Sequence, residues 1–185
     1  MLFLYHVIIL IITIFSPIII FYRVLKNKED KKRYIEKFSI SSKKRLKGKL
    51  IWFHGASVGE ILSIVPLIRN YEKNRSIAQI LITSSTLSSS NVLQKFKFKK
   101  TIHQFYPIDN FFLTNRFLKF WKPHVAVFID SEIWPCMYKN INDKEIPLIL
   151  LNARLTKKTF KKWMMLKDFA KSIFNKITIL SLIHI

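Results

Sequence analysis

Residues 50–60, LIWFHGASVGE, place a serine and a glutamate where a short apolar run gives way to a helical pattern. Within this stretch residues 55–59, GASVG, match G-x-S-x-G, the pattern of a hydrolase nucleophile elbow. Ser57 and Glu60 also match the S-x-x-E capping box, in which the serine accepts a hydrogen bond from the glutamate amide and the carboxylate reaches back. Glu60 follows His54 at a predicted helix N-terminus, where a carboxylate could also act as a general base toward a sugar hydroxyl.

A hydrolase would need an acid and a histidine downstream of the serine, and Asp109 or Asp130 with His184 could supply them. The position of the serine argues against this arrangement. A nucleophile elbow lies in the middle of a sheet, whereas only an apolar and a basic segment precede this serine and its strand. The pattern therefore favours helix capping by Ser57 and Glu60, and it leaves open a general base at Glu60.

The elements that must position these residues alternate along the chain. Short apolar runs rich in β-branched residues are expected to be strands: 50–53, 79–83, 102–106, 125–129, 148–151 and 177–183. The intervening helical patterns are 58–73, 87–98, 111–121, 133–140 and 157–175. Such alternation predicts a doubly wound, Rossmann-like α/β fold with a parallel sheet.

Polar clusters directly follow five of the predicted strands. These clusters are residues 54–60, 83–86, 107–109, 130–132 and 152–154. In a doubly wound sheet, ligands bind outside the carboxyl ends of the strands, so we expect the clusters to share one rim.

Composition limits the classes of partner and site. The 185 residues suffice for one domain with a core, and a net charge of +21 favours an anionic partner such as phosphate, lipid headgroup or nucleic acid.

Cys136 is the single cysteine, which excludes an intrachain disulfide and a cysteine-rich zinc site. His103 and His124 have no carboxylate or cysteine at ligand spacing, so no metal site is predicted. No nucleic-acid-binding motif is recognisable, and we expect no nucleic-acid partner.

Residues 2–22 carry no charge and, as a helix, would extend about 30 Å, enough to cross a bilayer core. They lack the basic start and small-residue end of a signal peptide. We therefore predict a single-pass transmembrane anchor over 1–22, with a re-entrant or interfacial helix as the alternative. The lysine- and arginine-rich segment 23–49 is expected to form a juxtamembrane helix on anionic headgroups and to place the remaining chain on the cytoplasmic face.

Three segments carry a family resemblance. Residues 54–60, HGASVGE, residues 130–135, DSEIWP, and residues 151–156, LNARLT, resemble the signature segments of the N-terminal half of Kdo transferases. These membrane-anchored enzymes transfer 3-deoxy-D-manno-octulosonic acid (Kdo) in lipopolysaccharide biosynthesis, and the similarity runs from the anchor to about Phe160. The chain departs from the family at Gly55, where alanine is usual, and at Asp130, where glutamate is usual.

The resemblance implies an inverting glycosyltransferase of the GT-B fold. Its donor would be CMP-Kdo and its acceptor a phosphorylated lipid A precursor at the inner membrane, with no cofactor. Glu60 would be the catalytic base that activates the acceptor hydroxyl, and Ser57 would cap the helix. Asp130, Glu132 and Arg154 would lie in the same cleft and help to hold the acceptor or the catalytic geometry.

The resemblance also implies a domain organisation. Residues 50–185 would form the Rossmann-like acceptor-side domain, and the GT-B domain that binds the donor is not expected within these residues. A chain with half of the cleft would not transfer sugar unaided and would need a C-terminal half, which a separate gene could encode. The alternative is a non-catalytic membrane-anchored adaptor or an acceptor-binding remnant.

Overall fold

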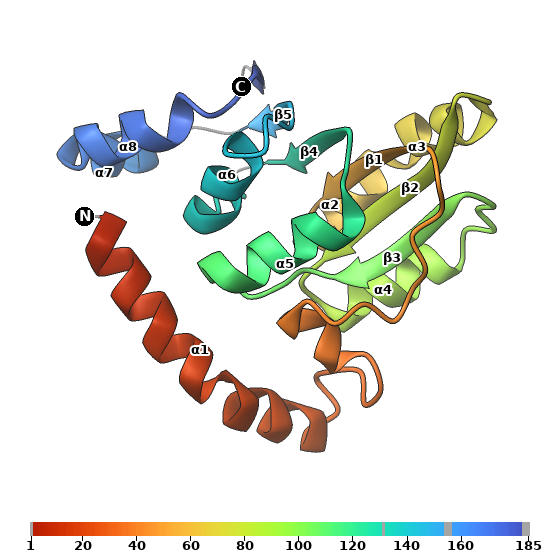
Figure 1. Ribbon diagram of the computed structural model, residues 1–185, viewed down its shortest axis with the longest axis horizontal. Helices are drawn as coiled ribbons and strands as arrows, with labels where there is room; N and C mark the ends of the chain where they lie inside the picture. The colour runs from red at the N-terminus through yellow and green to blue at the C-terminus, as the bar shows by residue number, and fades with distance from the viewer. Residues whose placement is uncertain (1, 131, 154–156, 183–185) are drawn as a thin grey trace.

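The computed structural model describes residues 2–130, 132–153 and 157–182. Its centre is a parallel sheet of six strands in the order β3-β2-β1-β4-β5-β6 (Figure 1). The strands are β1 (Lys49–His54), β2 (Ile77–Ser84), β3 (Thr101–Phe105), β4 (Val125–Ile129), β5 (Leu148–Ala153) and β6 (Ile179–Leu182). This Rossmann-like order confirms the predicted α/β fold, and each predicted strand is present with shifted ends. The order reverses between β1 and β4, the two central strands, and a ligand crevice is expected at that point.

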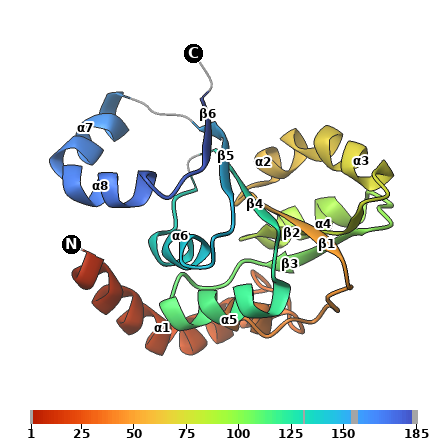
Figure 2. The same cartoon turned by 45° about the horizontal axis from the view of Figure 1, so that its top comes forward.

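Helices cover both faces of the sheet (Figure 2). One core holds the side chains of α2 (Val58–Ser63), α3 (Val65–Lys73) and α4 (Leu87–Gln94). The other holds those of α5 (Phe111–Trp121), α6 (Pro135–Asn142) and α8 (Lys167–Phe174). Neighbouring residues of β1 alternate between the two cores: Leu50 and Trp52 pack on one side, Ile51 and Phe53 on the other. Burial on both faces explains why the strands read as continuous apolar runs.

Two predicted helices are each divided in the structure. The pattern 58–73 forms α2 and α3, which meet at Ile64, just before Pro66 in the first turn of α3. Proline has no N–H to donate to the preceding turn, so the helix restarts at this position. The pattern 157–175 forms α7 (Lys157–Met165) and α8, which meet at Leu166.

The basic segment after residue 25 is not the helix that its composition suggested. Its helical part is confined to the 3₁₀ helix η1 (Tyr34–Phe38), and the remainder consists of turns and irregular backbone. Glu36 is fully buried and accepts hydrogen bonds from Arg33 and from the amide of Phe105, at the edge of β3. The segment folds onto the sheet because its buried acid needs these partners, which a helix on headgroups would not provide. It thereby covers the edge strand.

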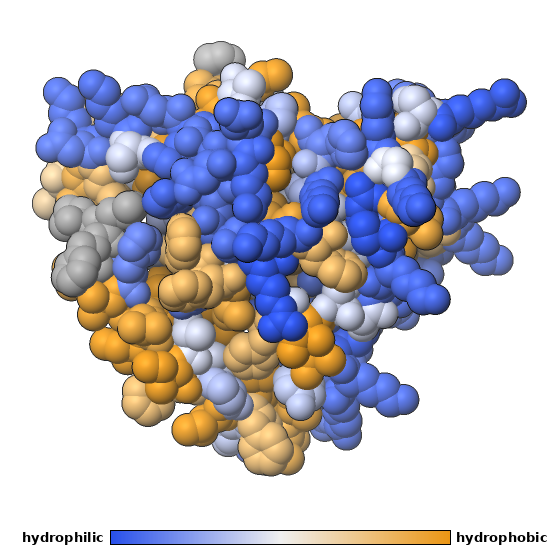
Figure 3. Space-filling view, in the orientation of Figure 1, coloured by the Kyte–Doolittle hydropathy of each residue, from blue (hydrophilic) through white to orange (hydrophobic). Residues whose placement is uncertain are grey.

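The first helix, α1 (Leu2–Leu25), is long and apolar enough over residues 4–25 to cross a membrane. Figures 1 and 2 both show it running beside α5. Apolar side chains dominate this part of the surface, which appears orange in Figure 3, whereas polar side chains cover most of the opposite side. The outward apolar side chains include Ile14, Ile18 and Phe21, each more than 60% exposed.

Candidate functional site

The turn from β1 to α2 confirms the predicted capping geometry. The Ser57 hydroxyl accepts a hydrogen bond from the Glu60 amide at 3.3 Å and donates one to Glu60 Oε1 at 2.6 Å. The other carboxylate oxygen accepts from the Ala56 amide at 2.8 Å, one residue before the Ser57 amide that a capping box predicts. These contacts hold the Glu60 carboxylate at the carboxyl end of the central strand. Its side chain is only partly buried, so the carboxylate can still be approached by a substrate.

Gly55 gives this carboxylate room. A Cβ atom at that position would lie 3.1 Å from Glu60 Cβ and 3.5 Å from Glu60 Oε2. A larger residue there would therefore press on the carboxylate that the capping contacts position.

His54, the last residue of β1, is fully buried beside this turn. Its Nδ1 lies 3.0 Å from the Thr83 hydroxyl and 3.2 Å from the Thr83 carbonyl oxygen, and its ring stacks on Tyr106 at 3.9 Å between centroids. Burial lowers the pKa of His54, although Glu132 and Glu60 act in the opposite direction. The imidazole is therefore neutral, and both glutamates lie within electrostatic range of it.

The other ring nitrogen of His54 faces Glu132. His54 Nε2 lies 3.7 Å from Glu132 Oε2, beyond hydrogen-bond distance, and has no hydrogen-bond partner among the described residues. Because the Thr83 hydroxyl accepts from Trp52 Nε1 at 2.9 Å, it can donate to Nδ1, which leaves the imidazole proton on Nε2, facing the carboxylate. The separation of 3.7 Å leaves Nε2 and Glu132 without a direct hydrogen bond, so a ligand hydroxyl that accepts from one and donates to the other would be favourable.

The loop after β4 brings Glu132 into this position. Trp134 Nε1 donates to Glu132 Oε2 at 3.0 Å, and the Tyr138 hydroxyl donates to the Glu132 carbonyl oxygen at 2.9 Å. Asp130 begins the loop with φ of 62°, in the left-handed region that aspartate tolerates better than most residues. Its amide donates to the Leu151 carbonyl oxygen at 2.8 Å, which ties the loop to the end of β5.

The structure thus gathers Ser57, Glu60 and Glu132 around His54 and places Asp130 at the start of the same loop. Arg154, the remaining predicted site residue, lies outside the described residues. Sequence reasoning did not include Tyr106 or Thr83 among the site residues, although both stand at carboxyl ends of predicted strands, where polar side chains were expected to meet.

Trp134 also connects this cluster to an apolar groove. The groove has a volume of about 900 Å³ and runs between β5, the start of α6, and the α7–α8 pair. Its lining includes Trp134, Leu150, Trp163 and Phe174. The same indole therefore meets a carboxylate on one side and an apolar surface on the other, an arrangement suited to a ligand with a polar and an apolar part.

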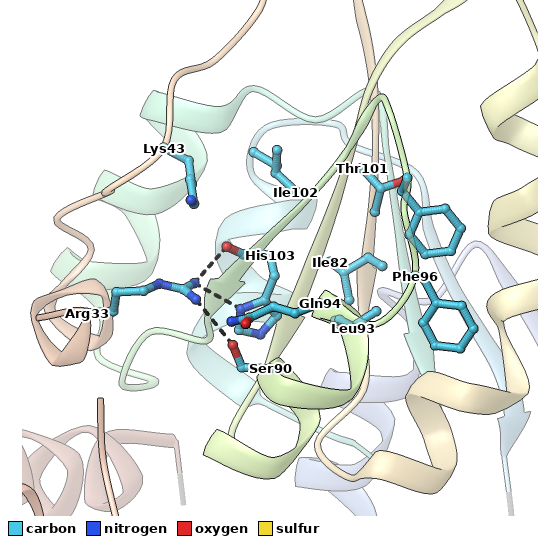
Figure 4. Close-up of a pocket in the computed structure, with 11 residues that line it drawn as sticks. Arg33, Lys43, Ile82, Ser90, Leu93, Gln94, Phe96, Thr101, Ile102 and His103 are labelled. Carbon is cyan, nitrogen blue, oxygen red and sulfur yellow. Dashed lines mark hydrogen bonds between the residues drawn. The ribbon is translucent and has the colours of Figure 1, made fainter. Parts of the chain in front are cut away.

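A second cavity, of about 280 Å³, lies at the β3 edge and contains none of the predicted site residues (Figure 4). Arg33 donates there to the His103 carbonyl oxygen at 2.7 Å and to the Ser90 hydroxyl at 3.2 Å, and it pairs with Glu36 at 2.9 Å. Burial, together with Arg33 and Lys43, lowers the pKa of His103 to about 3. The arginine is already neutralised, so this cavity supports the packing of η1 rather than the binding of an anion.

Metal chemistry finds no support in the described part of the chain. Within residues 2–130, 132–153 and 157–182, no group of three or more His, Cys, Asp or Glu side chains could hold a metal ion.

Comparison with known proteins identifies the family of the chain. Residues 32–184 match the family model described as 3-Deoxy-D-manno-octulosonic-acid transferase (kdotransferase). The chain is 43% identical over 135 residues to a 3-deoxy-D-manno-octulosonic acid transferase of Rickettsia felis, which covers 71% of this chain and 29% of that protein. It is 40% identical over 158 residues to the Rickettsia bellii transferase, covering 84% of this chain and 37% of the relative.

A plant protein shows similar likeness. The probable mitochondrial 3-deoxy-D-manno-octulosonic acid transferase of Arabidopsis thaliana is 38% identical over 151 residues, covering 80% of this chain and 34% of the relative. The chain therefore spans about a third of the length of these relatives. With the family model matched from η1 to the last strand, the chain belongs to the 3-deoxy-D-manno-octulosonic-acid transferase family.

Proposed function

We propose that this chain forms the acceptor-side domain of an inverting glycosyltransferase that transfers Kdo from CMP-Kdo to a phosphorylated lipid A precursor. The observation that carries this proposal is the Glu60 carboxylate, held by two donors at the carboxyl end of the central strand, beside the reversal of strand order. A general base needs such a fixed position within reach of the hydroxyl that it deprotonates.

In the proposed reaction, Glu60 takes the proton from an acceptor hydroxyl as that oxygen forms a bond to the anomeric carbon of Kdo. The bond from this carbon to the CMP phosphate breaks at the same time, and CMP leaves with the electron pair. One displacement inverts the anomeric carbon, so the chain needs no covalent nucleophile. Ser57 holds the base, and the resemblance assigns Asp130 and Glu132, with Arg154, to holding the acceptor or the catalytic geometry.

The surroundings of the site fit a lipid acceptor that carries phosphate. The apolar groove beside Trp134 can accommodate acyl chains, and the net charge of +21 favours phosphates and anionic headgroups.

We propose that α1 attaches the chain to the inner membrane with the domain on the cytoplasmic face. No cofactor or metal ion takes part in the proposed reaction. The donor would bind to a C-terminal half, whether in the same or a separate polypeptide.

Transfer of labelled Kdo from CMP-Kdo to a lipid A precursor tests the proposal. Membranes would contain either the chain alone or the chain fused to the remaining two thirds of the Rickettsia felis relative. We expect transfer by the fusion, and a loss of about 10²- to 10⁴-fold in the Glu60→Gln variant, the range typical of general-base catalysis. Glu145→Gln, which changes an exposed glutamate away from the cluster, is the matched control and should retain activity.

Acceptor binding distinguishes the enzyme from the adaptor. If the fusion binds the precursor but Glu60→Gln and the unaltered fusion transfer Kdo at equal rates, Glu60 is not the base. If the fusion binds the precursor without transferring any sugar, the chain is an acceptor-binding adaptor and the catalytic proposal is wrong.

A further inference from the structure

We infer that α1 lies along the domain, with its outer face in one leaflet of the membrane, instead of crossing the bilayer. The inference deepens the membrane attachment proposed above and rests on it. Three sets of contacts support it: one at each end of the helix and one along its inner face.

The first contact joins the N-terminal end of α1 to the core of the domain. The Tyr5 hydroxyl donates to Asp109 Oδ2 at 2.6 Å, and Asp109 is only 2% exposed. Asp109 also accepts from the amides of Cys136 and Met137 in the first turn of α6. Tyr5 thus completes the hydrogen bonds of a carboxylate that belongs to the folded domain.

The second contact fixes the other end of the helix. Arg23 Nε and Lys37 Nζ each lie 2.7 Å from Glu29 Oε1, and Glu29 is 3% exposed. Lys37 belongs to η1, which packs on the edge of the sheet. Both ends of α1 are therefore held against the same domain.

A membrane-spanning α1 cannot keep both contacts. At 1.5 Å per residue, about 27 Å of helix separates Tyr5 from Arg23, close to the thickness of the hydrocarbon core. A spanning helix with its basic flank on the cytoplasmic side would carry Tyr5 to the opposite surface. Asp109 would remain with the domain, so the spanning arrangement and the observed contact exclude each other.

The inner face of α1 has a different chemistry from its outer face. Buried or half-buried residues recur at helical spacing along the side that faces the domain: Tyr5, Ile9, Thr13, Ser16 and Ile20. The hydroxyls among them are satisfied by Asp109 or by backbone carbonyl oxygens of the same helix. The outer face carries only apolar side chains at its most exposed positions, including Ile14, Ile18 and Phe21.

This division of the two faces identifies the partner as a lipid monolayer. Because the contacts at both ends hold α1 against the domain, its apolar outer face can enter only the leaflet that adjoins the domain. Phe112 on α5 is 74% exposed and lines a cavity with His6 and Leu10 of α1, so it extends the same apolar surface. Figure 3 shows mostly orange and tan side chains over this part of the surface, with paler ones among them.

The location of the N-terminus tests the inference directly. A short neutral epitope placed before residue 1 of the full chain would be exposed to protease in inside-out and in right-side-out inner-membrane vesicles. We expect cleavage only in inside-out vesicles, because both ends of α1 would lie on the cytoplasmic side. Cleavage only in right-side-out vesicles would mean that α1 spans the bilayer and would overturn the inference. Loss of the chain from the membrane fraction would overturn it as well.

The single cysteine provides a second test that separates a docked helix from a re-entrant one. Ile9 and Cys136 line the same cavity between α1 and α6. In membranes, Ile9→Cys should form an oxidative cross-link to Cys136, detected as a linked peptide pair by mass spectrometry. Ile18→Cys, on the outer face, is the matched control and should not. Equal cross-linking of the two variants would contradict docking.

Neither experiment depends on sugar transfer. A failed transfer assay with a cytoplasmic N-terminus would therefore refute the catalytic proposal alone. Transfer by a chain whose N-terminus lies outside would refute only the docking of α1.

Discussion

Asp109 makes the stability of the domain depend on pH. Burial raises the pKa of its carboxyl from 3.8 to about 6, against the opposing effect of hydrogen bonds from Tyr5 and the amides of Cys136 and Met137. Because the folded pKa lies above the unfolded one, folding favours the protonated carboxyl. The contribution of this group to stability is therefore complete below about pH 4 and is lost as the pH rises through 6.

The size of the effect follows from the two pKa values. At about 1.4 kcal/mol per pKa unit, the difference between 3.8 and about 6 corresponds to about 3 kcal/mol in total, of which about 2 kcal/mol is lost between pH 4.5 and pH 7.5. Asp109→Asn removes the titration. The amide oxygen can still accept from one backbone N–H of α6, whereas the amide nitrogen cannot accept from the other. We therefore expect a pH-independent loss of about 1 kcal/mol, typical of one hydrogen bond.

Urea unfolding of the full chain in detergent micelles can be followed by tryptophan fluorescence from pH 4.5 to pH 7.5. It measures both the pH-dependent loss of the original chain and the pH-independent loss of the variant. His54 and His103 titrate in the opposite sense, because burial lowers their pKa values and their contribution is lost as the pH falls. The difference between the original chain and Asp109→Asn cancels these histidines. We expect this difference to shift by about 2 kcal/mol across the range, in favour of the variant at high pH. Parallel pH profiles would refute the argument that Asp109 is buried and ionises at a cost.

Three substitutions test other contacts. Glu36→Ala leaves the half-buried Arg33 without its carboxylate and the Phe105 amide without its acceptor. It should lower the free energy of unfolding by about 3–5 kcal/mol in urea, whereas a loss below 1 kcal/mol would show that the ion pair is dispensable. Ser57→Ala removes the N-cap of α2 and should lower the free energy of unfolding by about 1 kcal/mol in thermal unfolding, whereas Ser57→Thr should retain most of that stability. Equal stability of the two variants would exclude capping. Gly48→Ala should destabilise the domain by more than about 1 kcal/mol, because the φ of Gly48 is 107° and a Cβ there would lie 2.8 Å from Ala78 Cβ. Unchanged urea unfolding would mean that this turn relaxes without cost.

Local patterns accounted for the elements and for one part of the site. The six strands could be predicted because burial on both faces makes each of them a continuous apolar run. The contacts between Ser57 and Glu60 could be predicted because a capping box depends on residues three positions apart. The family was evident from three short segments, and the family comparison confirmed it.

Contacts between distant segments could not be predicted in the same way. The approach of Glu132 to His54, within 3.7 Å, depends on the parallel pairing of β1 with β4 and on the turn at Asp130. The lowered pKa of His54 depends on burial, which no local pattern reports.

The basic segment and the first helix show the same limit. By itself, the sequence determined that residues 2–22 would be apolar and helical, and that lysine and arginine would dominate the segment that follows. Only the tertiary structure decided that Glu36 would draw this segment onto β3 and that Tyr5 would bind Asp109. The physical reason is that periodicity and charge act between near neighbours in the chain, whereas a buried carboxylate finds its partners wherever the folded chain brings a donor.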